Sequence, residues 1–282
     1  MKIKYYGTSA GAGIPEIFCS CRVCEYARLH KGKDYRTRSQ AVIDDTFGID
    51  YSDVFQHSLH YGLDMRKIKH VLITHDHYDH FMKADIMSRA VGMTEPINFY
   101  FSEKTGMWLA NSVQARKEAF ASGARKCNGN EVLVETHFLE KLQRYDIASY
   151  TVIPLPARHG GDALGAYIYI IQKDGKSVLW AHDTGKFLDE THDFIKNSGI
   201  TFDLISLDCT LKRGEQITQG HMDVDWCKEM VDIMKSNGNA NDKTIVVLSH
   251  IGHLVERTHE ELEAEIAPLG MIPAFDGMEV VL

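Results

Sequence analysis

Short apolar or alternating segments recur along the chain and predict the strands of a layered α/β protein. The predicted strands cover residues 2–6, 41–43, 47–50, 70–73, 97–101, 150–157, 166–172, 177–181, 202–207 and 244–249. Helical patterns fall at residues 53–61, 81–91, 103–118, 187–198, 225–235 and 258–266. Ser102 is the expected N-cap of the third helix, and Asp174-Gly175 is a turn signal between two strands. Helices outside two sheets would make a four-layer αβ/βα sandwich.

No feature of the sequence divides the chain into separate domains. At 282 residues and 44% hydrophobic, the chain can bury a large core, and layered α/β folds often exceed the usual domain length. The sequence contains no Pro-rich or Ser-rich linker and no low-complexity tract. We therefore expect a single domain over residues 1–282.

Charge and hydropathy restrict the expected partners. Residues 1–6 form a predicted strand rather than a signal peptide, and no apolar run approaches the roughly 20 residues that span a bilayer. A net charge of −8 argues against a broad nucleic-acid footprint, which needs clustered Lys and Arg. The basic run at residues 30–38 fits a solvated loop better than a phosphate-steering site. We expect a cytoplasmic protein without a membrane partner, for which nucleic acid is a poor candidate.

The chemistry is concentrated in the segment Thr74-His75-Asp76-His77-Tyr78-Asp79-His80, directly after a predicted strand. Imidazole and carboxylate together suit zinc, manganese or iron. The spacing of His75 and His77 lets a bent loop aim both rings at one ion, while Asp79 and His80 can face a second. A polar surface loop is the alternative, but the segment lies between an apolar strand and a helical pattern.

Three later predicted strands also end at side chains that can bind metals. Their ends are followed by Arg158-His159-Gly160, by His182-Asp183-Thr184-Gly185 and by His250. Ligands delivered by several strand ends converge without strain because the sheet is a rigid scaffold. Each residue alone would be an ordinary polar side chain at a strand end, whereas the three in series after the histidine loop favour one metal site.

The order of these residues resembles the full ligand set of the metallo-β-lactamase-fold hydrolases, over residues 1 to about 253. The resemblance implies the four-layer sandwich, with two divalent ions, manganese or zinc with iron as a further candidate, at one edge. The ligands that it implies for the first ion are His75, His77 and His159, those for the second are Asp79, His80 and His250, and Asp183 bridges the two.

Two further residues match positions behind such a site. Asp50 matches an aspartate that family members place on an early strand, where it orients a ligand, although a turn carboxylate is the alternative. We interpret His182, next to Asp183, as another residue behind the ligands.

The motif Cys19-x-Cys21-x-x-Cys24 packs three thiols into a predicted loop at about residues 15–30. Structural zinc sites take thiolates, sometimes with one imidazole, at short spacing, and His253 could be the fourth ligand. This combination resembles the carbon-phosphorus lyase accessory phosphodiesterases of the PhnP type, and it implies one structural zinc that staples the loop beside the active site. A disulfide with a spare thiol, or three unrelated cysteines, are the alternatives.

Two metal ions can lower the pKa of a bridging water, polarise a substrate oxygen and clamp an in-line displacement, as phosphodiester hydrolysis requires. His221, in a polar loop before a predicted helix, resembles the loop histidine that assists phosphoryl chemistry in the PhnP and tRNase Z branch. Asp208, at the end of a predicted strand, could orient it, and Asp79 completes the predicted catalytic group. An ordinary histidine beside a helix is the alternative for His221.

The leading interpretation is a phosphodiesterase that cleaves a small or cyclic phosphate ester by hydroxide bound to the two ions. A tRNase Z-like tRNA 3'-processing endonuclease would carry a basic, Gly-rich arm, whereas residues 122–129 are a short segment of an acidic chain. A lactonase or thioesterase of the same fold would need neither His221 nor the thiols, and a non-enzymatic zinc-stapled binding protein would have lost ligands. The sequence leaves open the natural ester, the metals in vivo, the pathway and the oligomeric state, including a homodimer.

Overall fold

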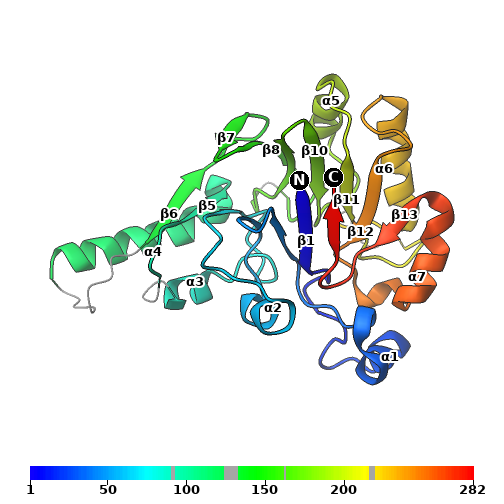
Figure 1. Cartoon of the computed structure of the whole chain (residues 1–282), viewed down its shortest axis with the longest axis horizontal. Helices are drawn as coiled ribbons and strands as arrows, with labels where there is room; N and C mark the ends of the chain where they lie inside the picture. Colours follow the sequence, from blue (N-terminus) through cyan, green and yellow to red (C-terminus); the bar gives the residue numbers. More distant parts are fainter. Residues whose placement is uncertain (90–92, 124–132, 162, 216–219) are drawn as a thin grey trace.

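Two seven-stranded sheets lie face to face in the computed structural model, which describes residues 1–89, 93–123, 133–161, 163–215 and 220–282 (Figure 1). The first sheet has the order β14-β1-β2-β3-β4-β5-β6, and the second β13-β12-β11-β10-β9-β8-β7. The strands of the first sheet are β1 (Lys2–Gly7), β2 (Gln40–Ile43), β3 (Phe47–Ile49), β4 (His70–Leu72), β5 (Ile97–Phe101), β6 (Val134–Phe138) and β14 (Glu279–Val281). Those of the second are β7 (Tyr145–Ile147), β8 (Tyr150–Pro156), β9 (Tyr167–Lys173), β10 (Lys176–Ala181), β11 (Leu204–Asp208), β12 (Ile245–Ser249) and β13 (Met271–Pro273).

Parallel pairing brings strand ends together. It runs from β3 to β6 in the first sheet and from β10 to β13 in the second, so the carboxyl ends of these strands share an edge of each sheet. β1 pairs antiparallel with β14, which places the two ends of the chain side by side (Figure 1). The loops that follow β3, β4, β8, β10, β11 and β12 carry the histidines and aspartates of the predicted site.

Helices cover the outer faces of both sheets. They are α1 (Arg22–His30), α2 (Val54–Tyr61), α3 (Lys83–Arg89), α4 (Glu103–Ala121), α5 (Asp189–Asn197), α6 (Val224–Ser236) and α7 (His259–Ile266). Val54 and Leu109, from α2 and α4, pack against the first sheet, while Ile195 and Leu262, from α5 and α7, pack against the second. The predicted four-layer αβ/βα sandwich is therefore confirmed. Among the described residues, no helix combines the length and the apolarity that crossing a bilayer requires.

Both faces of the central strands are buried, which explains why these strands are apolar throughout. In β10, Val178 and Trp180 face the core between the sheets, whereas Leu179 and Ala181 face the helices. Successive side chains of a strand point to opposite faces, so a strand covered on both sides needs apolar residues at nearly every position.

Several elements differ from the prediction. The segment expected as a loop at residues 15–30 contains α1, because Val23 and Ala27 lie one helical turn apart and both are buried. Helix α4 extends to Ala121, three residues beyond its predicted end. The sequence did not predict β6, β7, β13 and β14, which are the four edge strands of the two sheets. Residues 90 and 91, at the end of the helix predicted over residues 81–91, lie outside the described residues, as do residues 124–129.

Candidate metal centre

The histidine loop begins where β4 ends, and Asp50 anchors it. Asp50 follows β3 with a positive φ of 62°, and its Oδ1 accepts hydrogen bonds from the backbone N–H of Thr74 at 2.8 Å and from its hydroxyl at 2.9 Å. Its Oδ2 lies 2.6 Å from Nδ1 of His80. A carboxylate at this position therefore fixes both the start of the loop and the orientation of one imidazole, leaving Nε2 of His80 free to face the site.

One group of potential ligands consists of His75, His77, His159 and Asp183, whose ligand atoms all lie within 4.8 Å of one another. Nε2 of His75 lies 3.0 Å from Oδ2 of Asp183, and Nε2 of His159 lies 3.1 Å from Nδ1 of His77. The loop after β4, the end of β8 and the end of β10 supply these side chains. The structure thus brings together the four residues proposed from the resemblance for the first ion.

A second group consists of Asp79, His80, His250 and the same Asp183. Nε2 of His80 lies 2.9 Å from Oδ2 of Asp183, 3.1 Å from Nε2 of His250 and 3.4 Å from Oδ2 of Asp79. All four side chains are buried, which is unusual for two carboxylates and two imidazoles unless a cation or hydrogen bonds compensate them. Oδ2 of Asp183 faces both groups.

The spacing of these atoms fits metal coordination better than hydrogen bonding. Nε2 of His75 and Oδ1 of Asp183 are buried and make no hydrogen bond within the described part of the chain, although other polar atoms lie close to both. Two ligands that each lie about 2.1 Å from one zinc ion are roughly 3 to 3.4 Å apart. Side chains that approach to these distances without hydrogen-bond geometry are aimed at a common centre.

Two residues that the sequence analysis did not identify orient two further imidazoles. Nδ1 of His250 lies 2.9 Å from the hydroxyl of Thr210, and Nδ1 of His159 lies 3.0 Å from the carbonyl oxygen of Gly220. A Cβ at Gly220 would lie 3.0 Å from Nδ1 of His159, so a larger residue would disturb this contact. Thr210 could have been proposed from its position two residues after Asp208, whereas nothing local marks Gly220.

His221 lies against the second group of ligands. Its Nδ1 is 2.9 Å from Oδ2 of Asp208 and 3.1 Å from Oδ1 of Asp183, and its side chain remains 22% exposed. Burial would lower the pKa of His221, but Asp208 and Asp183 outweigh this effect and raise the pKa to about 11. Asp183, Asp208, His221 and His250 also lie close enough to hold a metal, a grouping that the sequence did not predict.

Asp208 is fully buried and accepts several hydrogen bonds. Its Oδ1 accepts from the backbone N–H groups of Thr210 and Met222, each at 3.1 Å, and its Oδ2 accepts from the N–H of Asp183 at 3.1 Å. Because Met222 follows His221, these bonds fix the backbone that carries the imidazole. The structure therefore places Asp208 where the sequence analysis expected an orienting carboxylate.

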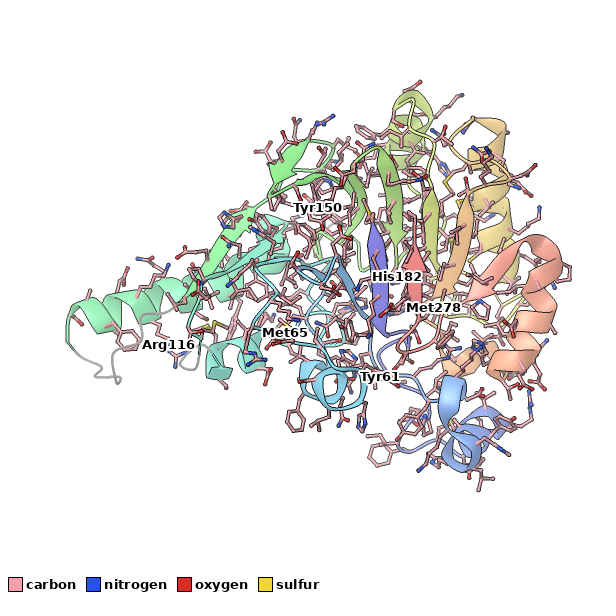
Figure 2. The ribbon with its side chains drawn as sticks, viewed as in Figure 1. Tyr61, Met65, Arg116, Tyr150, His182 and Met278 are labelled. Atoms are coloured by element: carbon pink, nitrogen blue, oxygen red, sulfur yellow. The ribbon has the colours of Figure 1, made fainter. Side chains whose placement is uncertain are left out.

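His182 lies near the centre of the molecule, between the sheets (Figure 2). Its Nε2 is 2.7 Å from the hydroxyl of Ser206, its Nδ1 is 3.3 Å from that of Ser39, and its ring packs 4.1 Å from the ring of Trp180. Within the described residues, these bonds do not connect His182 to a ligand side chain. Its ring also packs at 6.5 Å from the ring of His250, a ligand of the second group.

The protonation states reflect the charge of each group. Burial, together with the neighbouring His80, lowers the pKa of His75 to about 3, so this imidazole is neutral, as metal binding requires. Burial would also lower the pKa of His80, but the carboxylates of Asp50 and Asp79 outweigh it and raise that pKa well above its usual value. The second group of ligands therefore favours positive charge, either on its imidazoles or as a bound cation.

The three thiols meet His253 at the start of α1. Cys19, Cys21, Cys24 and His253 offer ligand atoms within 4.8 Å of one another. Sγ of Cys19 lies 3.3 Å and Sγ of Cys21 lies 3.7 Å from Nδ1 of His253. Zinc–sulfur and zinc–nitrogen bonds of about 2.3 and 2.1 Å place such atoms roughly 3.6 Å apart in a tetrahedral site. The donor set and its spacing fit zinc, and all three thiols are free.

Local hydrogen bonds stabilise the thiolate form of Cys21 and the loop that carries the cluster. Burial would raise the pKa of Cys21, but hydrogen bonds from the backbone of Cys24 and the side chain of His253 outweigh it and lower the pKa to about 6. Nη1 of Arg28 donates to the carbonyl oxygen of Cys19 at 2.6 Å, which ties the loop to α1. A thiolate is the form that binds metal, so the lowered pKa prepares Cys21 for zinc, whereas burial raises the pKa of Cys24, which would release its proton when the metal binds.

Comparison with curated proteins gives distant relatives of two kinds. The chain is 24% identical over its full length to an octanoyltransferase of Porphyromonas gingivalis, of which the match covers 52%. It is 26% identical, over 71% of its length, to the exodeoxyribonuclease WalJ of Streptococcus pneumoniae, of which the match covers 58%. The chain thus spans about half the length of these relatives.

Solved structures share the fold at low sequence identity. A diphosphatase from the PhnP family superposes with a TM-score of 0.71 and 22% identity, covering 100% of this chain and 97% of that one. Zinc-bound PqqB from Methylobacterium extorquens gives 0.70 and 17%, with both chains covered completely. The short form of human tRNase Z gives 0.62 and 14%, covering 100% and 99%.

The similarity also extends to a family-level sequence profile. Residues 43–251 match the profile described as the beta-lactamase superfamily domain, and this range contains every potential ligand of the histidine and aspartate groups. The solved structures agree with that match in fold. The chain therefore belongs to the β-lactamase superfamily and has the metallo-β-lactamase fold.

Proposed function

We propose that the protein is a metal-dependent hydrolase, and more specifically a dinuclear phosphodiesterase that cleaves a small or cyclic phosphate ester. The observation that carries the proposal is the position of Asp183 between the two ligand groups. Its Oδ2 lies 3.0 Å from Nε2 of His75 and 2.9 Å from Nε2 of His80. A single carboxylate oxygen between two sets of imidazole and carboxylate side chains suits a pair of divalent ions, manganese or zinc with iron as a further candidate.

Residues His75, His77 and His159 would hold one ion, Asp79, His80 and His250 the other, and Asp183 both. Such a pair supplies an activated water and neutralises the negative charge that develops on a phosphodiester during in-line displacement. Asp50, Thr210 and Gly220 hold the outer nitrogens of three imidazoles, so the ligands are oriented before substrate binds. Asp183→Asn should therefore weaken both halves of the centre.

His221 is the proposed proton donor to the leaving alcohol. Its Nδ1 is held by Asp208, and its partial exposure leaves the opposite side of the ring accessible. A cavity of about 770 Å³ borders His159 and Gly220, next to His221, and gives room for a small ester. A histidine that is anchored at one nitrogen and exposed beside the metal ligands can deliver a proton to the departing oxygen.

We also propose that Cys19, Cys21, Cys24 and His253 hold one structural zinc. This ion would join the segment before α1 to the loop after β12, only three residues beyond His250. The zinc would thereby stabilise a loop that carries an active-site ligand. In this proposal, residues 1–282 act as one domain.

A substrate panel tests the proposed function. Protein loaded with manganese or zinc is offered bis-p-nitrophenyl phosphate, a ribose 1,2-cyclic phosphate, a homoserine lactone and a thioester, with Asp183→Asn as the inactive control. We expect hydrolysis of phosphodiesters alone. Preferential turnover of the lactone or thioester would refute the phosphodiesterase assignment while leaving the metal centre intact.

The similarity to a curated exodeoxyribonuclease makes DNA ends a second candidate substrate. The net charge of −8 argues against it, since binding to DNA depends on neutralising phosphates. Single-stranded and double-stranded DNA belong in the same panel. Release of mononucleotides at a higher kcat/KM than any small ester would favour the nuclease.

A further inference from the structure

The metal centre opens to solvent beside Tyr78. His77 is the exposed ligand of the two groups, whereas His75, Asp79, His80, Asp183 and His250 are buried. Tyr78, between His77 and Asp79, is 60% exposed, although large aromatic side chains usually lie inside a protein. Tyr78 therefore lies beside the exposed ligand, on the solvent-facing part of the histidine loop.

The exposed ring of Tyr78 is held in place. Its hydroxyl donates a hydrogen bond to the carbonyl oxygen of Gly11 at 3.0 Å, and Nε of Arg38 donates to the same oxygen at 3.1 Å. The guanidinium carbon of Arg38 lies 4.9 Å from the ring centroid, in a cation–π contact, and Asp53 pairs with Arg38 at 3.1 Å. Three residues thus fix one aromatic side chain at the mouth of the site.

This arrangement leaves one face of the ring accessible. The guanidinium covers one face, so the exposure of the side chain comes mainly from the other. An aromatic ring that is already immobilised loses little conformational entropy when a second planar group stacks on it. Bases stack on such rings whatever their sequence, and an arginine on the opposite face adds to the attraction.

We propose that Tyr78 is the stacking platform for a nucleobase, so that the phosphate ester hydrolysed at the metal centre is that of a nucleoside. This inference rests on the proposed function for its hydrolytic step, but the stacking itself requires only binding. Tyr78 contacts the substrate and determines its class, while Arg38 and Gly11 position the ring.

The test compares adenosine 5'-monophosphate with ribose 5-phosphate, which has a hydroxyl group in place of the base. Their dissociation constants for the metal-loaded protein are measured by calorimetry. We expect the wild type to bind the nucleotide about tenfold more tightly or better, because a base that stacks on an aromatic side chain gains binding free energy that the sugar phosphate lacks. Tyr78→Leu should abolish this preference without changing the affinity for ribose 5-phosphate by more than about threefold.

Two further variants serve as controls. Tyr78→Phe keeps the ring but loses the hydrogen bond to Gly11, so it should retain most of the preference. Phe55→Leu removes an aromatic side chain of similar exposure, 58%, from α2 and should retain all of it.

Equal affinities of the wild type for the two ligands, or an equal loss of both in Tyr78→Leu, would overturn the stacking role. Loss of the preference in Tyr78→Phe to the same extent as in Tyr78→Leu would overturn it too, since the ring would then not be its source. Base-dependent binding without hydrolysis of any phosphodiester would support the platform and contradict the proposed function.

Discussion

Replacing His221 by alanine separates proton donation from metal binding. Its Nδ1 contacts Asp208 and Asp183 at 2.9 and 3.1 Å, so the proton available to a leaving group is on Nε2, on the partly exposed side chain. His221 belongs to neither of the two ligand groups around Oδ2 of Asp183. His221→Ala should therefore retain the bound metals and lose the acid.

The size of the effect depends on the leaving group. A general acid contributes typically about 10² to 10⁴-fold, which corresponds to about 3–5 kcal/mol of activation free energy. An alkyl alcohol leaves poorly as its anion and needs the proton, whereas p-nitrophenolate departs unaided. We expect His221→Ala to reduce kcat/KM for an alkyl phosphodiester by about 10² or more, and that for bis-p-nitrophenyl phosphate by less than about tenfold.

The assay compares the reduction of kcat/KM for the alkyl phosphodiester with that for bis-p-nitrophenyl phosphate in one preparation of His221→Ala. The metal content is measured on the same sample. The control is Asp208→Asn, which keeps an oxygen acceptor for His221 but removes the charge, and should give a smaller loss with the same dependence on leaving group. Equal losses for both esters in His221→Ala would refute the general-acid role and indicate that His221 positions the substrate. Loss of metal in His221→Ala would instead identify it as a ligand of the third grouping, with Asp183, Asp208 and His250.

Three further predictions concern the metals and the pH dependence. Cys21→Ser should lose one tightly bound zinc in elemental analysis and lower the unfolding midpoint; unchanged zinc and stability would contradict the structural site. Asp183→Asn should reduce turnover by orders of magnitude and weaken binding of the exchangeable ions in a metal titration, and full activity with normal metal content would exclude a shared carboxylate. Burial raises the pKa of Asp276 to about 6, so its contribution to stability is present at low pH and is lost as pH rises through 6. The unfolding free energy of wild type relative to Asp276→Asn should therefore fall by about 1 kcal/mol between pH 5 and 7.5, and a pH-independent difference in chemical denaturation would contradict the raised pKa.

The sequence determined the sandwich because its signals are local. Apolar segments such as residues 97–101 and 245–249 are too short for helices and are buried on both faces, so they could only be central strands. Ser102 caps α4 as expected, with its hydroxyl accepting from the N–H of Thr105. The edge strands escaped prediction because β7, β13 and β14 have three residues each, and their pairing depends on neighbours that are distant in the chain.

The order of histidines and aspartates also predicted which residues would form the metal site. The six-residue segment 75–80 and the ends of three later strands contain side chains of the types that bind metals. Only the tertiary structure decided the distances: that Oδ2 of Asp183 lies between His75 and His80, and that His221 contacts Asp208. It alone revealed Gly220, whose carbonyl reaches His159 across 61 positions. Residue types follow from the chain because their chemistry is intrinsic, whereas distances follow from how two sheets stack and where loops from different strands meet.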